Sequence, residues 1–403
     1  MTTPARGALH RVILNAESAF RTPAAAAAFV MPFTSWDVKR APNRQANNAF
    51  NQSPLAEKTD AGDPTVSGSF SAIFELRTIG RLLKLALGAP TTGKAVTKQP
   101  TNVTGVTIHY GSSDNANGNG TIAFVASGST LSWKTNAGTT GATVDVSAGG
   151  NFTLESGGGG KSIRVTVVAA SLPGTDQTDT DIAVSSTLKA HAFPVNTSAR
   201  PSALFESQHS DLSKYYRVTG AKVGRLGWNV LDNEQNVTGE IVAGAETEES
   251  SAFDANPTSV TWVRACAGKG QISDGSTGLG TVVGGSLEIN NNLQPYMAAD
   301  GLEGAGCIDE GELMIGGSMK TVWDSQGAYA KARAGTSTRL RLESAGISGS
   351  DTFRLVIDGL YAELTENAPA KQGKSGLFAD VGWKFHRGLY VPEIYLVNDV
   401  ASY

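Results

Sequence analysis

The chain has 403 residues, with 33 Lys or Arg against 37 Asp or Glu, and therefore a formal net charge of −4. Charged residues make up 17% of the chain, below the roughly 25% of ordinary soluble domains. The length is sufficient for two or three domains, and the acidic balance argues against a protein that holds nucleic acid by neutralising its phosphates. Abundant Gly (47 residues) together with many Thr and Ser predicts mainly β structure with frequent tight turns.

No catalytic or metal-binding motif is complete in this sequence. Residues 156–162 (SGGGGKS) resemble a phosphate-binding loop, but Glu155 occupies the position that the motif reserves for its first glycine. A β-hairpin loop is therefore the better interpretation. The histidines are scattered, and none has a second His or Cys at ligand spacing. We expect no enzyme, no cofactor and no metal site.

Cys266 and Cys307 lie far apart in the sequence and form no CxxC pattern. No apolar run approaches the roughly 18 residues that a membrane span requires, and the N-terminus lacks the apolar segment of a signal peptide. The sequence therefore predicts a soluble protein made in a reducing cytosol. Two small buried thiols are expected there, with a disulfide as the alternative.

Residues 1–66 are predicted to form a loop-rich N-terminal arm with seven basic and five acidic residues. The short apolar stretches 12–14 and 33–38 are candidate strands, but six prolines interrupt helices and central strands in this region. An ordered arm with so little core of its own would pack against another molecule. The alternative is a floppy tail.

Residues 67–88 (SGSFSAIFELRTIGRLLKLALG) are predicted to form a helix. Apolar residues recur there every three or four positions, and Gly88 followed by Pro90 supplies a stop signal. Arg77, Arg81 and Lys84 form a basic opposite face. The pattern favours a helix docked on a sheet over a helix that lies on a membrane surface.

Residues 98–188 differ from the rest of the chain in their low density of charge. Short stretches of alternating apolar and polar residues, such as 121–125 and 162–168, are separated by Asn-Gly, Ala-Gly and Gly-Gly turns. This spacing predicts a small sandwich or barrel, inserted after the helix, with Trp133 as its core aromatic residue.

Residues 190–403 predict an antiparallel sandwich with long connections. Glu240 is followed by Glu246, Glu248 and Glu249, which form a predicted acidic loop whose ordinary interpretation is a solvated turn. The candidate strands cover residues 215–218, 222–231, 239–243, 260–264, 285–290, 313–323, 338–343, 352–363 and 377–387.

Several segments resemble one family, the major tail tube proteins of long-tailed bacteriophages. The resemblance covers roughly residues 67–98 and 190–390, and it depends on the order and spacing of the whole set. The segments are LLKLALGAPTTG (82–93), HAF (191–193), ARPSALFESQHSDLSKYYRVTGAKV (199–223), GSLEINNNLQPYM (285–297), GGSMKTVWD (316–324) and KARAGTSTRLRL (331–342). Residues 98–188 resemble an immunoglobulin-like insert found in some tail proteins, with LSWKTNAGTTGATVDVSAGGNFTL (131–154) as the most similar stretch.

The resemblance implies a mainly β fold: a tail-tube β-sandwich with one flanking α-helix, formed by residues 67–97 and 189–403, and an outward-facing Ig-like module at 98–188. It also implies hexameric rings that stack into the tube of a flexible, sheathless, siphovirus-like tail. Residues 1–66 are the candidate contact between rings. The expected location is the virion, after synthesis in the host cytoplasm. The expected partners are other copies of the chain, the tail terminator and the distal tail or tape-measure proteins, and genomic DNA would pass through without specific binding.

Two sets of acidic residues are candidate functional sites under this resemblance. Glu240 and Glu288 are expected on or near the inner wall, because an acidic or neutral lining repels phosphate whereas a basic lining binds it. The loop with Glu246, Glu248 and Glu249 is a candidate subunit interface. The alternative function is a carbohydrate-binding β-sandwich adhesin or another tail-associated binding protein, and no membrane association is expected in either case.

Overall fold

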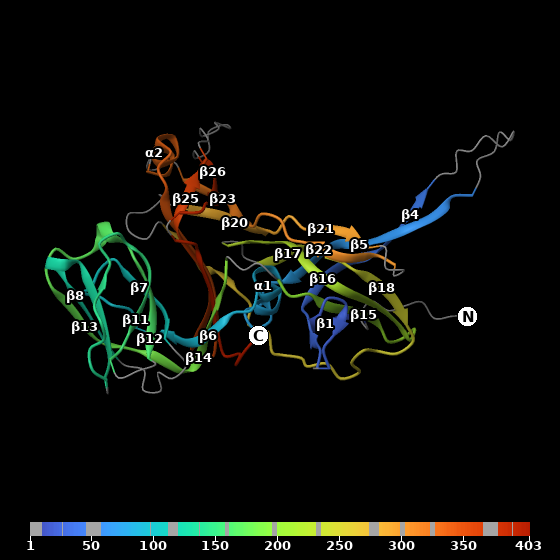
Figure 1. The fold of residues 1–403 in the computed structure, drawn as a ribbon, viewed down its shortest axis with the longest axis horizontal. Helices are drawn as coiled ribbons and strands as arrows, with labels where there is room; N and C mark the ends of the chain where they lie inside the picture. Colours follow the sequence, from blue (N-terminus) through green and yellow to red (C-terminus); the bar gives the residue numbers. More distant parts are fainter. Residues whose placement is uncertain are drawn as a thin grey trace.

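Antiparallel strands dominate the structure, and the prediction of a mainly β fold is confirmed. Most strands belong to one connected set of sheets, while a four-stranded sheet lies at one end of the elongated molecule (Figure 1). The computed structural model describes residues 10–25, 27–45, 58–96, 98–111, 120–136, 138–157, 161–195, 200–230, 235–273, 282–298, 303–322, 327–365, 378–388 and 390–403.

The first layer, called sheet I, follows the order β4, β5, β17, β16, β20, β23 and β26, with every neighbouring pair antiparallel. Its strands alternate between buried apolar and exposed polar residues, the pattern of a sheet with one face on a core. The bounds are β4 (Phe33–Gln45), β5 (Asp60–Ile73), β17 (Asn236–Ala243), β16 (Lys214–Asn229), β20 (Val282–Asn290), β23 (Met314–Val322) and β26 (Phe378–Phe385).

Strand β16 is long enough to belong to two layers. Its first half pairs with β15 and β18, and its second half pairs with β17 and β20. The layer around the first half, called sheet II, contains β1 (His10–Ala19), β3 (Phe29–Val30), β15 (Ala203–His209) and β18 (Ala245–Glu249), and the short β2 (Thr22–Pro23) pairs with β1.

The third layer, called sheet III, connects the body of the protein to residues 98–188. It contains β19 (Cys266–Ser273), β24 (Thr338–Ser348), β25 (Asp351–Leu364), β27 (Glu393–Asn398), β14 (Val184–Phe193) and β6 (Thr91–Val96). A separate two-stranded ribbon is formed by β21 (Gln294–Met297) and β22 (Ala305–Asp309).

Two helices complete the body, and the first of them lies in the core. Helix α1 (Ile79–Leu87) buries seven of its nine residues and contacts β16 and β14. Helix α2 (Gly327–Ala334) lies near the end of β25 and β26 (Figure 1). The main core joins α1 to all three sheets, with Phe74, Phe205 and Phe353 among its largest fully buried side chains.

The predicted helix over residues 67–88 is wrong in its first half. Residues 67–73 are the end of β5, where Val66, Phe70 and Ala72 are buried while Ser67 and Ser69 are exposed. That period of two suits a strand, and β5 is held by β4 on one side and β17 on the other. Tertiary pairing therefore overrides the three-to-four spacing that the apolar residues also satisfy.

The helix begins only after a buried carboxylate. Glu75 is fully buried, and its Oε2 accepts hydrogen bonds from the backbone N–H of Thr78 (2.6 Å) and from the Thr78 hydroxyl (2.7 Å). These bonds satisfy donors at the start of α1. At the other end Gly88 has a φ of 112°, so the predicted stop signal is confirmed.

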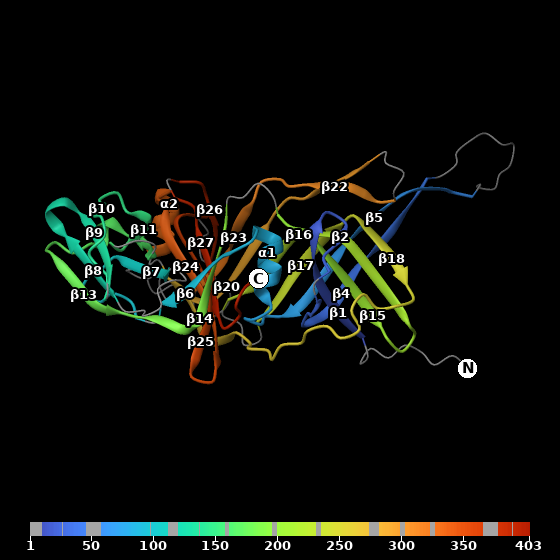
Figure 2. The same ribbon diagram turned by 60° about the horizontal axis from the view of Figure 1, so that its bottom comes forward.

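The prediction of a loop-rich N-terminal arm is also wrong for the residues that the structure describes. Strand β1 pairs with β15 along its length, and Ile13 is completely buried. The apolar stretch 12–14 is therefore part of the core of the chain itself. Strands β4 and β5 form a long hairpin whose far part projects from the body (Figure 2); residues 1–9 and 46–57 of the predicted arm lie outside the described residues.

Residues 98–188 contain a small two-layered β structure with its own core. Trp133, Ile122 and Leu131 from one layer pack with Ile108 and Val165 from the other. The first layer is β10 (Val144–Asp145), β9 (Thr130–Thr135), β8 (Gly120–Val125) and β13 (Gln177–Ile182); the second is β7 (Val106–Gly111), β12 (Ser162–Val167) and β11 (Gly150–Glu155).

The remaining differences concern one strand, one hairpin and the cysteines. Residues 260–264 are an extended segment with a single bridge between Arg264 and Glu75 rather than a strand. The hairpin predicted in place of a phosphate loop is confirmed, because β11 and β12 pair antiparallel up to Glu155 and Ser162. Cys266 and Cys307 are both free and exposed, so neither the disulfide nor the buried thiols are observed.

Candidate functional site

Sheet I has one open side, which we call the polar face. In β17 the side chains of Val237 and Ile241 are buried, whereas those of Thr238 and Glu240 are exposed, and the same alternation continues across the neighbouring strands. The polar face includes Asp37, Lys39, Ser69, Arg225, Thr238, Glu240, Ser286, Glu288, Ser318, Lys320, Glu363, Phe378, Asp380 and Lys384.

The two predicted wall residues, Glu240 and Glu288, lie on the polar face and share one cation. Arg225 stands directly opposite Glu240 in the β16–β17 register, and its Nη1 lies 3.4 Å from Glu240 Oε1. On the other side, Arg225 Nη2 donates to Glu288 Oε2 at 2.5 Å. The hydrogen bond and the charge of Glu288 raise the pKa of Arg225, so the group carries two carboxylates around a permanently charged guanidinium.

Two other cations of the polar face have carboxylates close by, and a third lies over an aromatic ring. Lys39 Nζ lies 2.7 Å from Asp37 Oδ1, and Lys384 Nζ lies 3.0 Å from Glu363 Oε2. Lys320 Nζ lies 4.9 Å from the centre of the Phe378 ring. Exposed ion pairs of this kind stabilise a fold by only about 0–1 kcal/mol each. Their larger effect is on the potential of the surface, because each pair removes a cation that phosphate would otherwise bind.

Between the charged groups the polar face consists of small side chains. Ser286 and Ser318 hydrogen-bond across β20 and β23 with 2.9 Å between their hydroxyl oxygens. On the buried side, Gly239 leaves room for Phe70, since a Cβ atom at Gly239 would fall 2.4 Å from that ring. The strands therefore stay close together, and the open side stays flat and hydroxyl-rich.

The predicted acidic loop is instead the strand β18, and it lies in sheet II. Glu248 forms an ion pair with Lys214, Glu249 lies 3.8 Å from Arg217, and Glu246 accepts a hydrogen bond from the backbone N–H of Arg40. The loop was a wrong prediction because acidic residues are poor strand formers; here pairing with β16 holds them in a strand. These three carboxylates contact a different set of groups from Glu240 and Glu288.

Sequence reasoning missed the residues that complete the polar face. Arg225, Lys384 and Glu363 carry no motif, and their roles depend on which residue stands opposite which across the strands. The only available signal was alternation, since Arg225 is a charged residue inside the apolar stretch 222–231. Register is not visible in one sequence, so the pairing of Arg225 with both glutamates was not predicted.

The described part of the chain offers no arrangement for catalysis by a metal. Within those residues, no three His, Cys, Asp or Glu side chains are grouped so that they would hold an ion. None of the helices within the described ranges is both long enough and apolar enough to cross a membrane. The fold and the polar face thus define a β-sheet protein with an extended open surface.

Comparison with known families agrees with that class. Residues 183–385, just over half of the chain, match the Phage tail tube protein family, and the chain belongs to this family. A search of curated proteins found no match. The protein is therefore a structural component of the phage tail tube, non-enzymatic, located in the virion tail, and it polymerises with itself. Because the chain belongs to this family, the alternative function as an adhesin is no longer needed.

Proposed function

We propose that copies of this chain close into hexameric rings with the polar face of sheet I on the inside, and that the stacked rings conduct DNA. The observation that carries this proposal is the polar face itself, where Glu240 and Glu288 flank Arg225. A duplex that slides along such a wall meets hydroxyls and neutralised cations. It therefore releases few counterions and is not held.

Ring closure follows from the two ends of sheet I. In the described residues, β4 pairs with β5 on one side only, and β26 pairs with β25 only over Phe385–Trp383. An open strand edge tends to pair with another chain. Six antiparallel steps separate β4 from β26, so the two edges run in the same direction. The contact between neighbours would be parallel and head-to-tail, which is the kind that closes into a ring.

The long hairpin of β4 and β5 is our candidate for a contact between rings, in place of the whole arm 1–66. It projects beyond the rest of the molecule (Figure 2) and is basic near its described end, with Lys39, Arg40 and Arg44. Its residues from Arg40 to Gln45 are exposed although they are paired with β5. A paired but uncovered ribbon of this length is suited to lie against a second copy.

The two-layered module at 98–188 is proposed to face outward as an Ig-like insert of the ring body at 67–97 and 189–403. In Figure 1 the strands of sheet I run along the top of the molecule and α1 lies below them, while the module lies at the left end. A module inside the lumen would obstruct DNA. The tail terminator and the distal tail or tape-measure proteins are the proposed partners at the two ends of a siphovirus-like, sheathless tube.

The direct test is assembly of the purified full chain. Negative-stain electron microscopy should show rings and tubes, and particles that remain single would contradict the proposal. The contribution of the polar face is tested separately, in virions, with the Glu240→Lys and Glu288→Lys variants described in the Discussion.

A further inference from the structure

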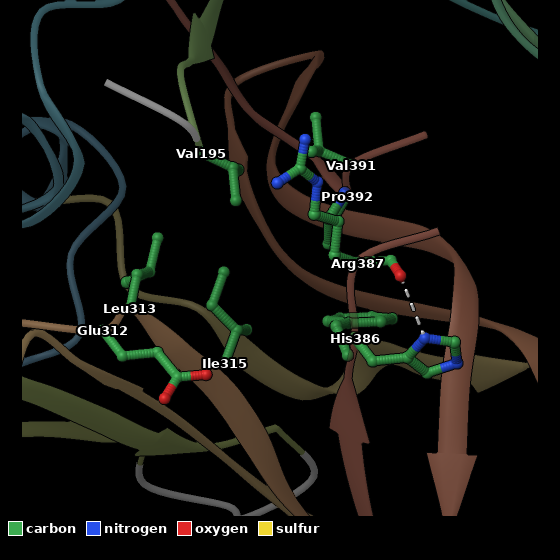
Figure 3. Close-up of a pocket in the computed structure, with 9 residues that line it drawn as sticks. Val195, Glu312, Leu313, Ile315, His386, Arg387, Val391 and Pro392 are labelled. Atoms are coloured by element: carbon green, nitrogen blue, oxygen red, sulfur yellow. Dashed lines mark hydrogen bonds between the residues drawn. The ribbon is translucent and has the colours of Figure 1, made fainter. Parts of the chain in front are cut away.

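A hollow of about 260 Å³ opens at one end of strands β23 and β26. Figure 3 shows Leu313 and Ile315 on one side of it and Val391 on the other, with the Glu312 carboxylate at the lower rim and the Arg387 guanidinium at the opposite rim. Val391 is an exposed large apolar residue. The hollow is thus lined on its inner sides by apolar side chains, and its mouth carries the Glu312 carboxylate on one rim and the Arg387 guanidinium on the other.

The opposite end of the same two strands carries a protruding aromatic group. Phe378 begins β26 and remains 38% exposed, and the Lys320 ammonium lies 4.9 Å from the centre of its ring. Phe378 stands opposite Val322 in the register, whereas Phe385, at the far end of β26, lines the hollow. Seven residues of strand separate the two, or roughly 23 Å.

We propose that Phe378 and Lys320 of one copy enter this hollow in the copy of the adjoining ring, and this inference rests on the proposed tube. The phenyl ring would fill the apolar recess, and the Lys320 ammonium would meet Glu312. Size permits this, since an apolar cavity of about 150 Å³ already accommodates benzene. An aromatic anchor in a fitted recess is the usual form of an interface hot spot.

The occupant must be a second copy because the protruding group and the recess lie at opposite ends of the same strands. One chain cannot bring them together without bending β26 back on itself. A contact between two different surfaces that is repeated along the strand direction does not close, and it generates a filament. The polymerisation of the family with itself supplies the second copy, and the lysine at one end and the glutamate at the other supply opposite charges.

The test measures ring and tube formation of the full chain over a series of protein concentrations, by sedimentation and negative-stain microscopy. Phe378→Ser should leave rings intact but raise the concentration at which tubes appear by about tenfold or more. The matched control is Val125→Ser, which removes an equally exposed apolar side chain (38%) from the module and should leave tubes unchanged.

Charge reversal gives the second arm of the test. Lys320→Glu and Glu312→Lys should each reduce tubes, and the double variant should restore them, because the pair is re-formed with its signs exchanged. Tubes from Phe378→Ser at wild-type concentration would overturn this contact alone. Loss of rings in folded Phe378→Ser protein would also overturn it, since the residue would then act within the ring. A wild-type chain that forms no rings would overturn the proposed function as well.

Discussion

The body of the protein and the module at 98–188 are both layered β structures, but they differ in which faces and edges of their sheets are covered. The body leaves the polar face of sheet I open, and in the described residues β4 pairs on one side only while β26 meets β25 only over Phe385–Trp383. The module buries the apolar sides of its two sheets against each other around Trp133. The body is therefore built for association, whereas the module is complete within one chain.

The module is nevertheless fixed firmly to the body. Sheet III continues into it through the pairing of β6 with β7, and Arg164 of the module lies 2.7 Å from Glu393 of β27. Behind that pair lies a buried ionic cluster, in which Asp358 is bound by Arg339 and Arg341. Arg339 also donates to Thr107 of the module at 3.4 Å. The module is therefore joined to the body by a continuous sheet and by side-chain contacts.

The largest effect is expected from breaking this junction. Asp358 is almost completely buried (3% exposed) and accepts a hydrogen bond from Arg339 Nε at 2.8 Å. Asp358→Ala removes the carboxylate that binds the largely buried Arg339 and leaves Arg341 with Glu343 alone, which should lower the free energy of unfolding by about 3–5 kcal/mol. Urea unfolding followed by circular dichroism measures this. Asp145→Ala, at an exposed position of the module, should change stability by less than about 0.5 kcal/mol.

A core substitution in the module tests whether the module and the body unfold independently. Trp133 is 1% exposed, and Trp133→Ala should destabilise the module by about 3–5 kcal/mol through the cavity that it leaves. The body should keep its own transition, so calorimetry should resolve two steps in place of one. The matched control is Trp262→Ala, whose side chain is 44% exposed. A single transition lowered as a whole would show that the two cores unfold as one unit.

The junction also predicts a pH dependence. Complete burial lowers the pKa of His109 to about 3, although the charge of Asp358 opposes the shift. Its Nε2 lies 2.6 Å from the Thr166 hydroxyl, and the Tyr395 ring is 4.8 Å away. Because the folded pKa lies below the usual value of about 6.5, this group stabilises the fold above pH 6.5 and loses that contribution as the pH falls from there toward 3.

The expected slope is up to about 1.4 kcal/mol per pH unit in that window. His109→Gln, which stays neutral, should flatten the curve of unfolding free energy against pH between about 6.5 and 3. Equal slopes for wild type and His109→Gln would contradict the account of the junction.

Substitutions on the polar face should change the free energy of unfolding least. They should nevertheless have a clear effect on function. The double variant Glu240→Lys with Glu288→Lys places three cations together at Arg225 and should still assemble. It should slow DNA ejection by about tenfold at about 50 mM salt and approach wild type at about 200 mM, because salt weakens phosphate binding. Glu155→Lys with Asp176→Lys, on the exposed module surface, is the control. Wild-type ejection from the first variant would argue against the polar face as the wall.

The sequence was sufficient for the β class and the stop signal at Gly88, because alternation, turn residues and glycine are local signals. The sequence was insufficient where one pattern of apolar residues fits both a helix and a strand. Phe70 and Phe74 satisfy helical spacing, but Phe70 lies in β5 and Phe74 follows it. The arm was misread because the short stretch 12–14 owes its burial to β15, nearly 200 residues away. In the candidate site, Glu240 and Glu288 were chosen from the sequence, and the structure places both beside Arg225. The role of Arg225 could not be predicted because it depends on strand register.

A density map of tubes assembled from the purified full chain would show directly which surface lines the channel. Arg225, Glu240 and Glu288 should line the channel, and the module should lie on the outer surface of the tube. A map that places the polar face between subunits or on the outside, or the module in the channel, would contradict it.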